Sequence, residues 1–351
     1  MAFGKLLGST GGLKQDKAVD QIVSSVWGDL IDAAERHNEP GTFTTFLGWE
    51  WTTIYQGANL HRIVLMKEGR DKAEQIVPYG FLESGPDPRA LWSWLEETTE
   101  RIDATFIAIP HNSNISKGMM FSKLDINGKP ITPEHAQMSA KWEPIVEVTQ
   151  VKGDSESHPM LSPNDEFADY YSWEPASFSE KTTTPEMLPK EYAREALKRG
   201  LAYQEQLGAN PFKFGMIGST DAHTSIPSTE EDNFYGKISA AEPSGNPLRY
   251  EELVNGRLSP DPKTKTRLYE SMAGGLTAIW ARENTREALW NAMAAKEVFA
   301  TTGTRLKVRV FGGWDLSQAD LDRYNFAQYG YEKGVPMGGD LSQAHKGDAP
   351  T

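Results

Sequence analysis

The stretch Phe212-Lys-Phe-Gly-Met-Ile-Gly-Ser-Thr-Asp-Ala-His223 decides the expected fold and the place of the functional site. Its first half is short and apolar, which is typical of a buried strand. Gly218 ends this strand, and Asp221 and His223 follow closely. Since ligands and catalytic groups of parallel α/β folds collect at the carboxyl ends of strands, this order predicts a functional site. A Ser-Thr-Asp turn with a nearby histidine is also typical of a solvated helix start, so the pair alone leaves both interpretations open.

Three other segments combine an apolar strand with a polar end. Residues 42–51, 104–109 and 144–150 are rich in β-branched, aromatic or aliphatic residues, which favours strands. The metal-competent side chains at or near their ends are Glu50, His111 and Glu147. A carboxylate buried without a partner is costly, so each glutamate either points to solvent or faces a cation. His111 is either a turn histidine or a ligand, and its place after a buried strand favours the ligand.

Strands alternate with helices along much of the chain. The further expected strands are residues 62–66, 212–217 and 306–310, and the expected helices are an amphipathic one around 19–31 and those at 88–99, 189–200 and 284–296. Residues 42–51 and 62–66 are placed to form a hairpin. The alternation as a whole predicts an α/β fold with a parallel sheet or barrel.

Composition divides the chain into three parts. Residues 1–40 form an N-terminal helical segment, residues 41–313 the main domain, and residues 314–351 a polar, Gly-rich tail that reads as a truncated continuation. Within the main domain, residues 224–275 are rich in Pro, Gly, Ser and charge without clear periodicity. A stretch of this length in a compact domain is usually functional or mobile, and we interpret it as a lid over the site.

The net charge of the chain limits the classes of binding partner that we expect. Lys and Arg number 36 against 49 Asp and Glu, a formal net charge of −13. This excess argues against nucleic acid and membrane surfaces as partners, so we expect a small-molecule substrate. No run reaches the roughly 18 apolar residues of a membrane span, and Met1–Gly8 is too short and Gly-rich for a signal peptide. We expect a soluble chain; its localisation stays open because it has no cysteine to indicate a redox compartment.

The donor types indicate the metal and the reaction. Carboxylate and imidazole together suit Zn²⁺, Mn²⁺ or Fe²⁺, whereas Mg²⁺ and Ca²⁺ prefer oxygen alone, so zinc or manganese is expected first. Such an ion lowers the pKa of a bound water to roughly 7, which suits hydrolysis. The sequence contains no G-x-S-x-G, Walker A or H-E-x-x-H motif, and no G-x-G-x-x-G after an expected strand. The absence of these motifs narrows the chemistry toward metal-dependent hydrolysis.

Further candidates lie close to the same strand ends. His61 precedes the strand at 62–66 and is either a structural histidine or a catalytic residue. The loop Gly153-Asp-Ser-Glu-Ser-His158 follows a strand, which makes Asp154 and His158 catalytic candidates against the alternative of a solvated loop. The candidates for substrate binding are Arg62, Asn112 and Lys152, with Arg62 and Lys152 as anion contacts.

Several stretches resemble the bacterial DUF3604 family, from about Trp27 onward. They are Phe43–Trp51, Asn59–Arg62, Ile109–Asn112, Gly153–Pro159, Leu161–Asp169, Asn210–His223 and Arg309–Trp314. That family is itself similar to the polymerase and histidinol phosphatase (PHP) superfamily, whose fold is a distorted (β/α)7 barrel that holds up to three metal ions at the carboxyl ends of its strands. The resemblance therefore implies a PHP-like barrel with long loop insertions and one to three divalent ions.

The resemblance also assigns roles residue by residue. It implies Glu50 as a bridging metal carboxylate, His111 as a ligand, and Asp221 with His223 as the closing Asp-x-His pair. Glu147 lies near another ligand position, where PHP proteins usually carry a histidine. PHP proteins open with a His-x-His strand, which DUF3604 chains carry upstream of the region matched here, whereas residues 1–40 contain only His37. We therefore expect a fragment with an incomplete barrel; related chains are often exported to the periplasm.

These observations lead to two functional hypotheses. The first is a metal-dependent hydrolase that uses metal-activated water on a phosphoester or a related ester. The second is a non-catalytic, ligand-binding PHP-like barrel whose metal site is incomplete. Metal content of the purified protein discriminates them, and the sequence leaves the oligomeric state and the identity of the substrate open.

Overall fold

The structure is a computed structural model, and it describes residues 17–80, 84–173, 183–237, 245, 271–341 and 350–351. It has a mixed α/β architecture in which the strands form several small sheets. Most of the segment expected to form a lid, residues 238–244 and 246–270, lies outside the described residues. Within the described part of the chain, no helix is long and apolar enough to cross a membrane.

The first sheet is antiparallel and has the order β1-β4-β5. Its strands are β1 (Leu47–Trp51), β4 (Arg62–Met66) and β5 (Phe106–Pro110). The pairing of β1 with β4 confirms the expected hairpin, and the short strands β2 (Ile54–Tyr55) and β3 (Ala58–Asn59) pair within its connection. The pairing of β4 with β5 is also antiparallel, so the expected parallel pairing is not found in this sheet.

The second sheet has the order β7-β6-β8 and contains a parallel pair. β6 (Ile145–Gln150) runs parallel to β8 (Gly215–Gly218) and antiparallel to the two-residue β7 (Gly153–Asp154). β5 lies beside β6, and β8 lies beside β10 (Val298–Thr301), which pairs with β9 (Leu276–Ile279). The strands are thus arranged side by side, but those of the described ranges do not close into a barrel.

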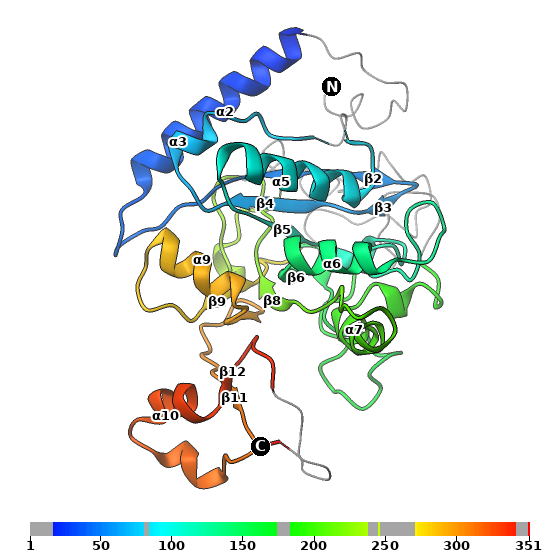
Figure 1. Ribbon diagram of the computed structural model, residues 1–351, viewed down its shortest axis with the longest axis vertical. Helices are drawn as coiled ribbons and strands as arrows, with labels where there is room; N and C mark the ends of the chain where they lie inside the picture. The colour runs from blue at the N-terminus through cyan, green and yellow to red at the C-terminus, as the bar shows by residue number, and fades with distance from the viewer. Residues whose placement is uncertain (1–16, 81–83, 174–182, 238–244, 246–270, 342–349) are drawn as a thin grey trace.

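Most helices pack around this row of strands, and the most C-terminal one lies apart from it (Figure 1). They are α2 (Lys17–His37), α3 (Arg70–Ala73), α5 (Pro88–Ile102), α6 (Pro133–Trp142), α7 (Ala193–Leu207), α9 (Arg286–Ala294) and α10 (Phe326–Lys333). Local chemistry explains their starts: Asp87 and Thr132 accept the backbone N–H groups of Arg89 and His135, each before a proline at the first helical position. α9 begins after Thr285, one residue beyond the expected cap.

The two faces of the first sheet meet different cores. Side chains alternate along a strand, so residues directly opposite in register share a face. Trp51 lies opposite Arg62, on the face that α5 covers with its buried Trp92 (Figure 1). Ile63 lies opposite both Glu50 and Ile109, and this second face packs toward Ile145, Ile217 and Trp290. We call it the inner face, because the candidate site lies at its end.

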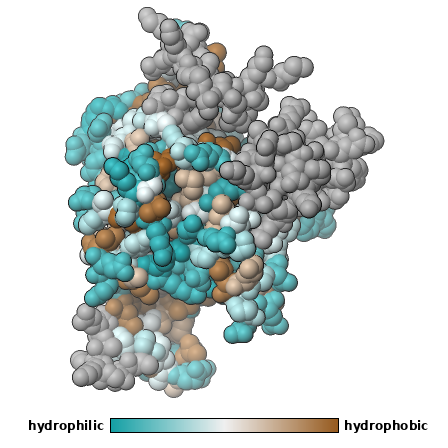
Figure 2. Space-filling model, turned by 90° about the vertical axis from the view of Figure 1, so that its right-hand side faces the viewer, coloured by the Kyte–Doolittle hydropathy of each residue, from teal (hydrophilic) through white to brown (hydrophobic). Residues whose placement is uncertain are grey.

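The periphery differs from the expectations in two ways: the strand at 306–310 is missing, and part of the apolar stripe of α2 is exposed. The strand expected at 306–310 is absent from the structure, which instead pairs β9 with β10 upstream and β11 (Phe311–Gly312) with β12 (Val335–Pro336). These C-terminal strands and α10 lie together at one end of the molecule (Figure 1). The helix α2 forms as expected, but Ile22 and Val26 on its apolar stripe are 63% and 59% exposed. On the face seen in Figure 2, hydrophilic and hydrophobic residues are interspersed.

Candidate metal centre

Glu50, His61 and His111 meet at the end of the inner face. Glu50 comes from β1, His61 directly precedes β4, and His111 directly follows β5. His61 Nδ1 and His111 Nε2 lie 2.8 Å and 3.0 Å from the same oxygen, Oε1 of Glu50. The three side chains offer one ligand atom each, and these atoms all lie within 4.8 Å of one another. Three residues separated by up to 61 positions in the chain therefore form one group, which we call the Glu50 cluster.

Burial and hydrogen bonds set the protonation states of Glu50 and His61. Burial raises the pKa of the Glu50 carboxyl, but the hydrogen bonds from His111 and His61 outweigh burial and hold that pKa well below its usual range. Burial lowers the pKa of His61 to about 4, against the opposing effect of Glu50. At neutral pH the cluster is thus a carboxylate beside a neutral His61 imidazole. Deprotonated imidazole and carboxylate are the forms that bind metals.

The donor set and its surroundings fit a borderline divalent ion. Zinc lies about 2.0–2.2 Å from nitrogen and oxygen ligands in a tetrahedral site, so neighbouring ligand atoms are about 3.4 Å apart. The distances of 2.8 Å and 3.0 Å from the two imidazole nitrogens to Glu50 Oε1 are somewhat shorter than this value. One oxygen and two imidazole nitrogens are the donors that Zn²⁺, Mn²⁺ and Fe²⁺ accept. His61 Nε2 and His111 Nδ1 are buried without a hydrogen-bond partner, so the site does not satisfy either imidazole completely by protein contacts.

A second group of polar side chains is centred on Asp221, in the loop after β8. The Oδ2 atom of Asp221 accepts a hydrogen bond from Gln150 Nε2 over 2.8 Å and from Lys152 Nζ, and it lies 3.0 Å from Lys237 Nζ. His223 lies beside this group, with Nδ1 2.7 Å from Lys237 Nζ. The backbone of Asp221 has φ of 50°, in the left-handed region, and Lys237 also donates to its carbonyl oxygen.

Glu147 and Asn112 are two further buried polar residues near these groups. Glu147 is buried, its Oε2 accepts a hydrogen bond from Ser219, and its Oε1 has no partner. Asn112 is fully buried, and its Oδ1 accepts from Gln150 over 2.9 Å. Gln150 therefore connects Asn112, which follows His111 directly, to Asp221.

The structure brings most of the expected site residues to this end of the strands. Glu50 and His111 form one group, and Lys152, Asp221 and His223 form the other. His61, expected as a catalytic candidate, contributes the third ligand atom of the Glu50 cluster. Burial lowers the pKa of both Lys152 and Lys237, and the charges of Glu50 and Glu147 oppose this effect, so the two groups lie within electrostatic range of each other.

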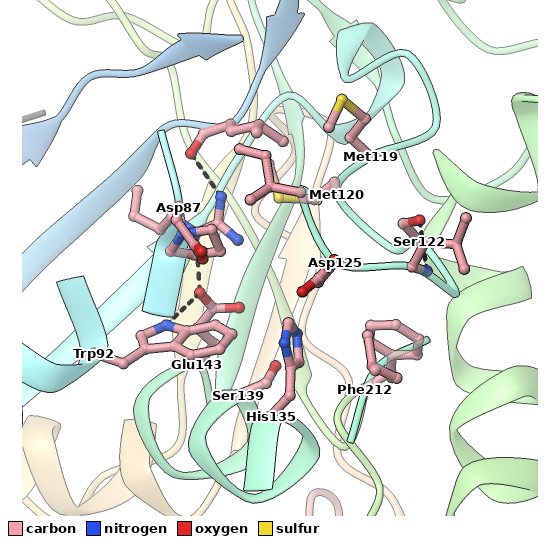
Figure 3. A pocket seen from close by; sticks show the side chains of 16 residues that line it. Asp87, Trp92, Met119, Met120, Ser122, Asp125, His135, Ser139, Glu143 and Phe212 are labelled. Carbon is pink, nitrogen blue, oxygen red and sulfur yellow. Dashed lines mark hydrogen bonds and ion pairs between the residues drawn. The ribbon is translucent and has the colours of Figure 1, made fainter. Parts of the chain in front are cut away.

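Arg62 lies on the opposite face from the cluster. Its Nε donates to Glu143 Oε1 over 2.9 Å, and Trp92 Nε1 donates to the same oxygen. These groups line a separate cavity of about 50 Å³ beneath α5, next to His135 (Figure 3). Arg62 was expected as an anion contact, and in the structure its guanidinium is paired with the carboxylate of Glu143.

Asp154 and His158 also lie apart from the cluster. Asp154 lines a groove with Phe214 and Lys296, accepts the backbone N–H of Glu156 over 2.8 Å, and has its pKa raised by burial to about 7. His158 Nδ1 accepts the backbone N–H of Met160 over 3.2 Å, and its ring contacts that of Tyr192. Their contacts in the structure are with this loop and its neighbours.

Two residues of the site were not predicted. Gln150 is the last residue of β6 and is buried. A polar amide at the end of an apolar strand was a local signal that could have predicted it. Lys237 is 3% exposed although it comes from the polar stretch that follows His223. No periodicity marks it, so only the folded loop shows that it contacts Asp221.

Comparison with known proteins identifies a family. Searches of curated proteins and of solved structures found nothing similar. The family described as "Protein of unknown function (DUF3604)" matches residues 8–351, which is nearly the whole chain. The motifs around Glu50, His61, His111 and Asp221 all lie within this match, and the chain belongs to the DUF3604 family.

Proposed function

We propose that this chain is a metal-dependent hydrolase that uses metal-activated water on a phosphoester or a related ester of a small molecule. The observation that carries the proposal is the Glu50 cluster: a carboxylate and two imidazoles from three neighbouring strands place their ligand atoms within 4.8 Å. The three side chains are 26%, 10% and 2% exposed for Glu50, His61 and His111, so a ligand can enter from the Glu50 side.

The cluster would hold one divalent ion, zinc or manganese first and iron as a further candidate. A bound ion of this type lowers the pKa of a coordinated water to roughly 7 and so supplies hydroxide near neutral pH. The chain's own residues would do the remaining work. Glu50 orients both imidazoles through one oxygen. Burial lowers the pKa of Lys152 and of Lys237, and in their protonated forms the two lysines would stabilise the negative charge of a hydrolytic transition state.

We further propose that Asp221, His223 and Glu147 belong to the same centre, which would allow up to three ions. Asp221 Oδ1 and His223 Nδ1 lie 3.6 Å apart, and the Oε1 atom of Glu147 is buried without a partner. These donors follow or lie within the parallel strands β6 and β8, as the donors of a PHP-like barrel do. The row of strands from β1 to β9 would then be part of such a barrel.

The test measures metal binding and turnover separately. Zinc and manganese content is measured by mass spectrometry after reconstitution, and hydrolysis of p-nitrophenyl phosphate and of a p-nitrophenyl carboxylic ester is followed in the same samples. Glu50→Gln and His111→Gln should both lose metal and activity, whereas the exposed His37→Gln serves as the matched control. Unchanged metal content and turnover in both cluster variants would contradict the assignment of the Glu50 cluster as a hydrolytic metal site.

A specific observation supports the second candidate, a non-catalytic binding barrel. Asp221 is bound by two lysines and a glutamine, so its carboxylate is engaged by the protein itself. In that case the purified chain would bind neither Zn²⁺ nor Mn²⁺, although it would retain the polar end of the strands for another ligand. Metal titration of the wild-type chain therefore separates the two candidates.

A further inference from the structure

One oxygen of Asp221 collects three hydrogen-bond donors. Gln150 Nε2, Lys152 Nζ and Lys237 Nζ all point at Oδ2, and the two lysine side chains are only 8% and 4% exposed. Two ammonium groups on one carboxylate oxygen are more than a structural ion pair requires. Burial of a cation is costly unless an anion offsets it, and Asp221 alone carries too little charge for two lysines, so Glu50 and Glu147 also have to be counted.

The sum of the charges around the site also favours an anionic ligand. With every group ionised, the two ammonium groups stand against the three carboxylates Glu50, Glu147 and Asp221, for a net charge of −1. A divalent ion at the Glu50 cluster would change this sum to +1. The loaded site would then have an excess of buried positive charge on the side of Lys152 and Lys237, and an anionic ligand would offset it.

We propose that Lys152, Lys237 and Gln150 form an anion subsite that binds the phosphoryl oxygens of a phosphate-bearing substrate. The inference rests on the proposed hydrolase function, because it specifies the substrate of that site. A carboxylate ligand would only replace Asp221 with a group of equal charge. A phosphate dianion carries more charge and three acceptor oxygens, so it can compete with Asp221 for both lysines at once, and lysine acts as a point charge for phosphate.

The structure also defines what Asp221 does in this subsite. Its carboxylate occupies the lysine donors when no ligand is bound, so it competes with an incoming anion. Its backbone is held in the left-handed region partly by Lys237, which donates to the carbonyl oxygen. Removal of the Asp221 charge should therefore strengthen phosphate binding, whereas removal of a lysine charge should weaken it. A merely structural role for these residues does not produce these opposite signs.

The probe is inorganic phosphate, titrated calorimetrically into the chain with and without Mn²⁺, and manganese binding is measured first in a separate titration. Lys152→Met and Lys237→Met should each weaken phosphate binding at least about tenfold, which corresponds to about 1.4 kcal/mol. Asp221→Asn should bind phosphate more tightly than the wild type. Lys198→Met, which removes an exposed lysine, is the matched control and should bind as the wild type does.

A further variant distinguishes a loss of phosphate binding from a loss of folding. Lys237→Gln keeps a donor for the carbonyl of Asp221 while it removes the charge, and its melting temperature shows whether it is folded. If Mn²⁺ binds but phosphate binding is absent or equal in the folded lysine variants, the subsite is wrong and the metal centre stands. If Mn²⁺ does not bind but phosphate binding still depends on both lysines, the subsite stands and the proposed hydrolase function fails.

Discussion

His61 and Arg62 are neighbours in the chain, yet their side chains lie on opposite faces of the same sheet. His61 Nδ1 is 2.8 Å from Glu50 Oε1 on the inner face, and Arg62 Nε donates over 2.9 Å to Glu143 beneath α5. The alternation of side chains along a strand causes this separation. Variants at these two adjacent positions should therefore affect different properties of the protein.

At position 61, we expect loss of metal affinity with little loss of stability. His61→Gln removes one of the two imidazole nitrogens of the Glu50 cluster, and even the loss of an outer-shell partner costs about 10–100-fold in metal affinity. The affinity for Zn²⁺ should fall by at least that factor in a competition titration with a chromogenic chelator. His37→Gln is the control, and an equal affinity in the two variants would remove His61 from the centre.

At position 62, the expected result is the reverse. Arg62→Met leaves the carboxylate of Glu143, whose side chain is 8% exposed, buried without its cation. Breaking a buried pair in this way costs about 3–5 kcal/mol, so the free energy of unfolding in urea should fall by about that amount. Metal affinity at the Glu50 cluster should not change. The double variant Arg62→Met with Glu143→Gln should regain part of the lost stability, and failure to do so would contradict this account.

Gln150 should act on both groups of the site because it bonds Asn112 and Asp221. Gln150→Leu keeps the approximate volume but leaves the buried Oδ1 of Asn112 without this donor, at a cost of about 1–3 kcal/mol. We expect a lower melting temperature and weaker phosphate binding together. Gln204→Leu in the exposed part of α7 is the control, and phosphate binding equal to that of the wild type in Gln150→Leu would exclude the positioning role.

Asp154 should make stability depend on pH. Its pKa rises from 3.8 to about 7 on folding because the carboxyl is buried, so the folded state holds its proton more tightly than the unfolded state. The resulting stabilisation is fully present below about pH 4 and is lost as pH rises through about 7, by at most about 4 kcal/mol. Asp154→Asn should lack this component.

The measurement is urea unfolding of both proteins at pH 5 and pH 8. The Asn side chain keeps the acceptor for Glu156 N. The free energy of unfolding of Asp154→Asn, relative to that of the wild type, should therefore be higher at pH 8 than at pH 5. Asp103→Asn, at a fully exposed helix end, is the control. A constant difference between Asp154→Asn and the wild type at both values would show that Asp154 does not titrate in this range.

Metal should stabilise the folded chain by mass action. An ion that binds only the folded state contributes about 2.7 kcal/mol at 100 times its dissociation constant. Addition of Mn²⁺ or Zn²⁺ should therefore raise the melting temperature, and EDTA should reverse the change. Glu50→Gln should show no such shift, because it lacks the negative charge of the carboxylate that both imidazoles contact. A shift of equal size in Glu50→Gln would place the ion elsewhere.

Local patterns in the sequence predicted many of the elements around the site. The runs at 62–66, 104–109 and 144–150 correspond to β4, β5 and β6, because β-branched and aromatic residues favour strands wherever they occur. The order of strand and polar end also placed Glu50 and His111 in one site. The strand expected at 306–310 failed because apolar residues predict burial only where a neighbouring strand is available, and Leu306 is 64% exposed.

Only the tertiary structure decided which partner each polar residue meets. Alternation predicts that His61 and Arg62 point to opposite sides, but the packing of α5 on one face decides which of the two belongs to the site. Lys237 shows the same limit: it has no local signal, and it joins the site because the loop after β8 folds back on Asp221. Periodicity depends on near neighbours in the chain, whereas contacts between different elements and loops depend on how those parts pack.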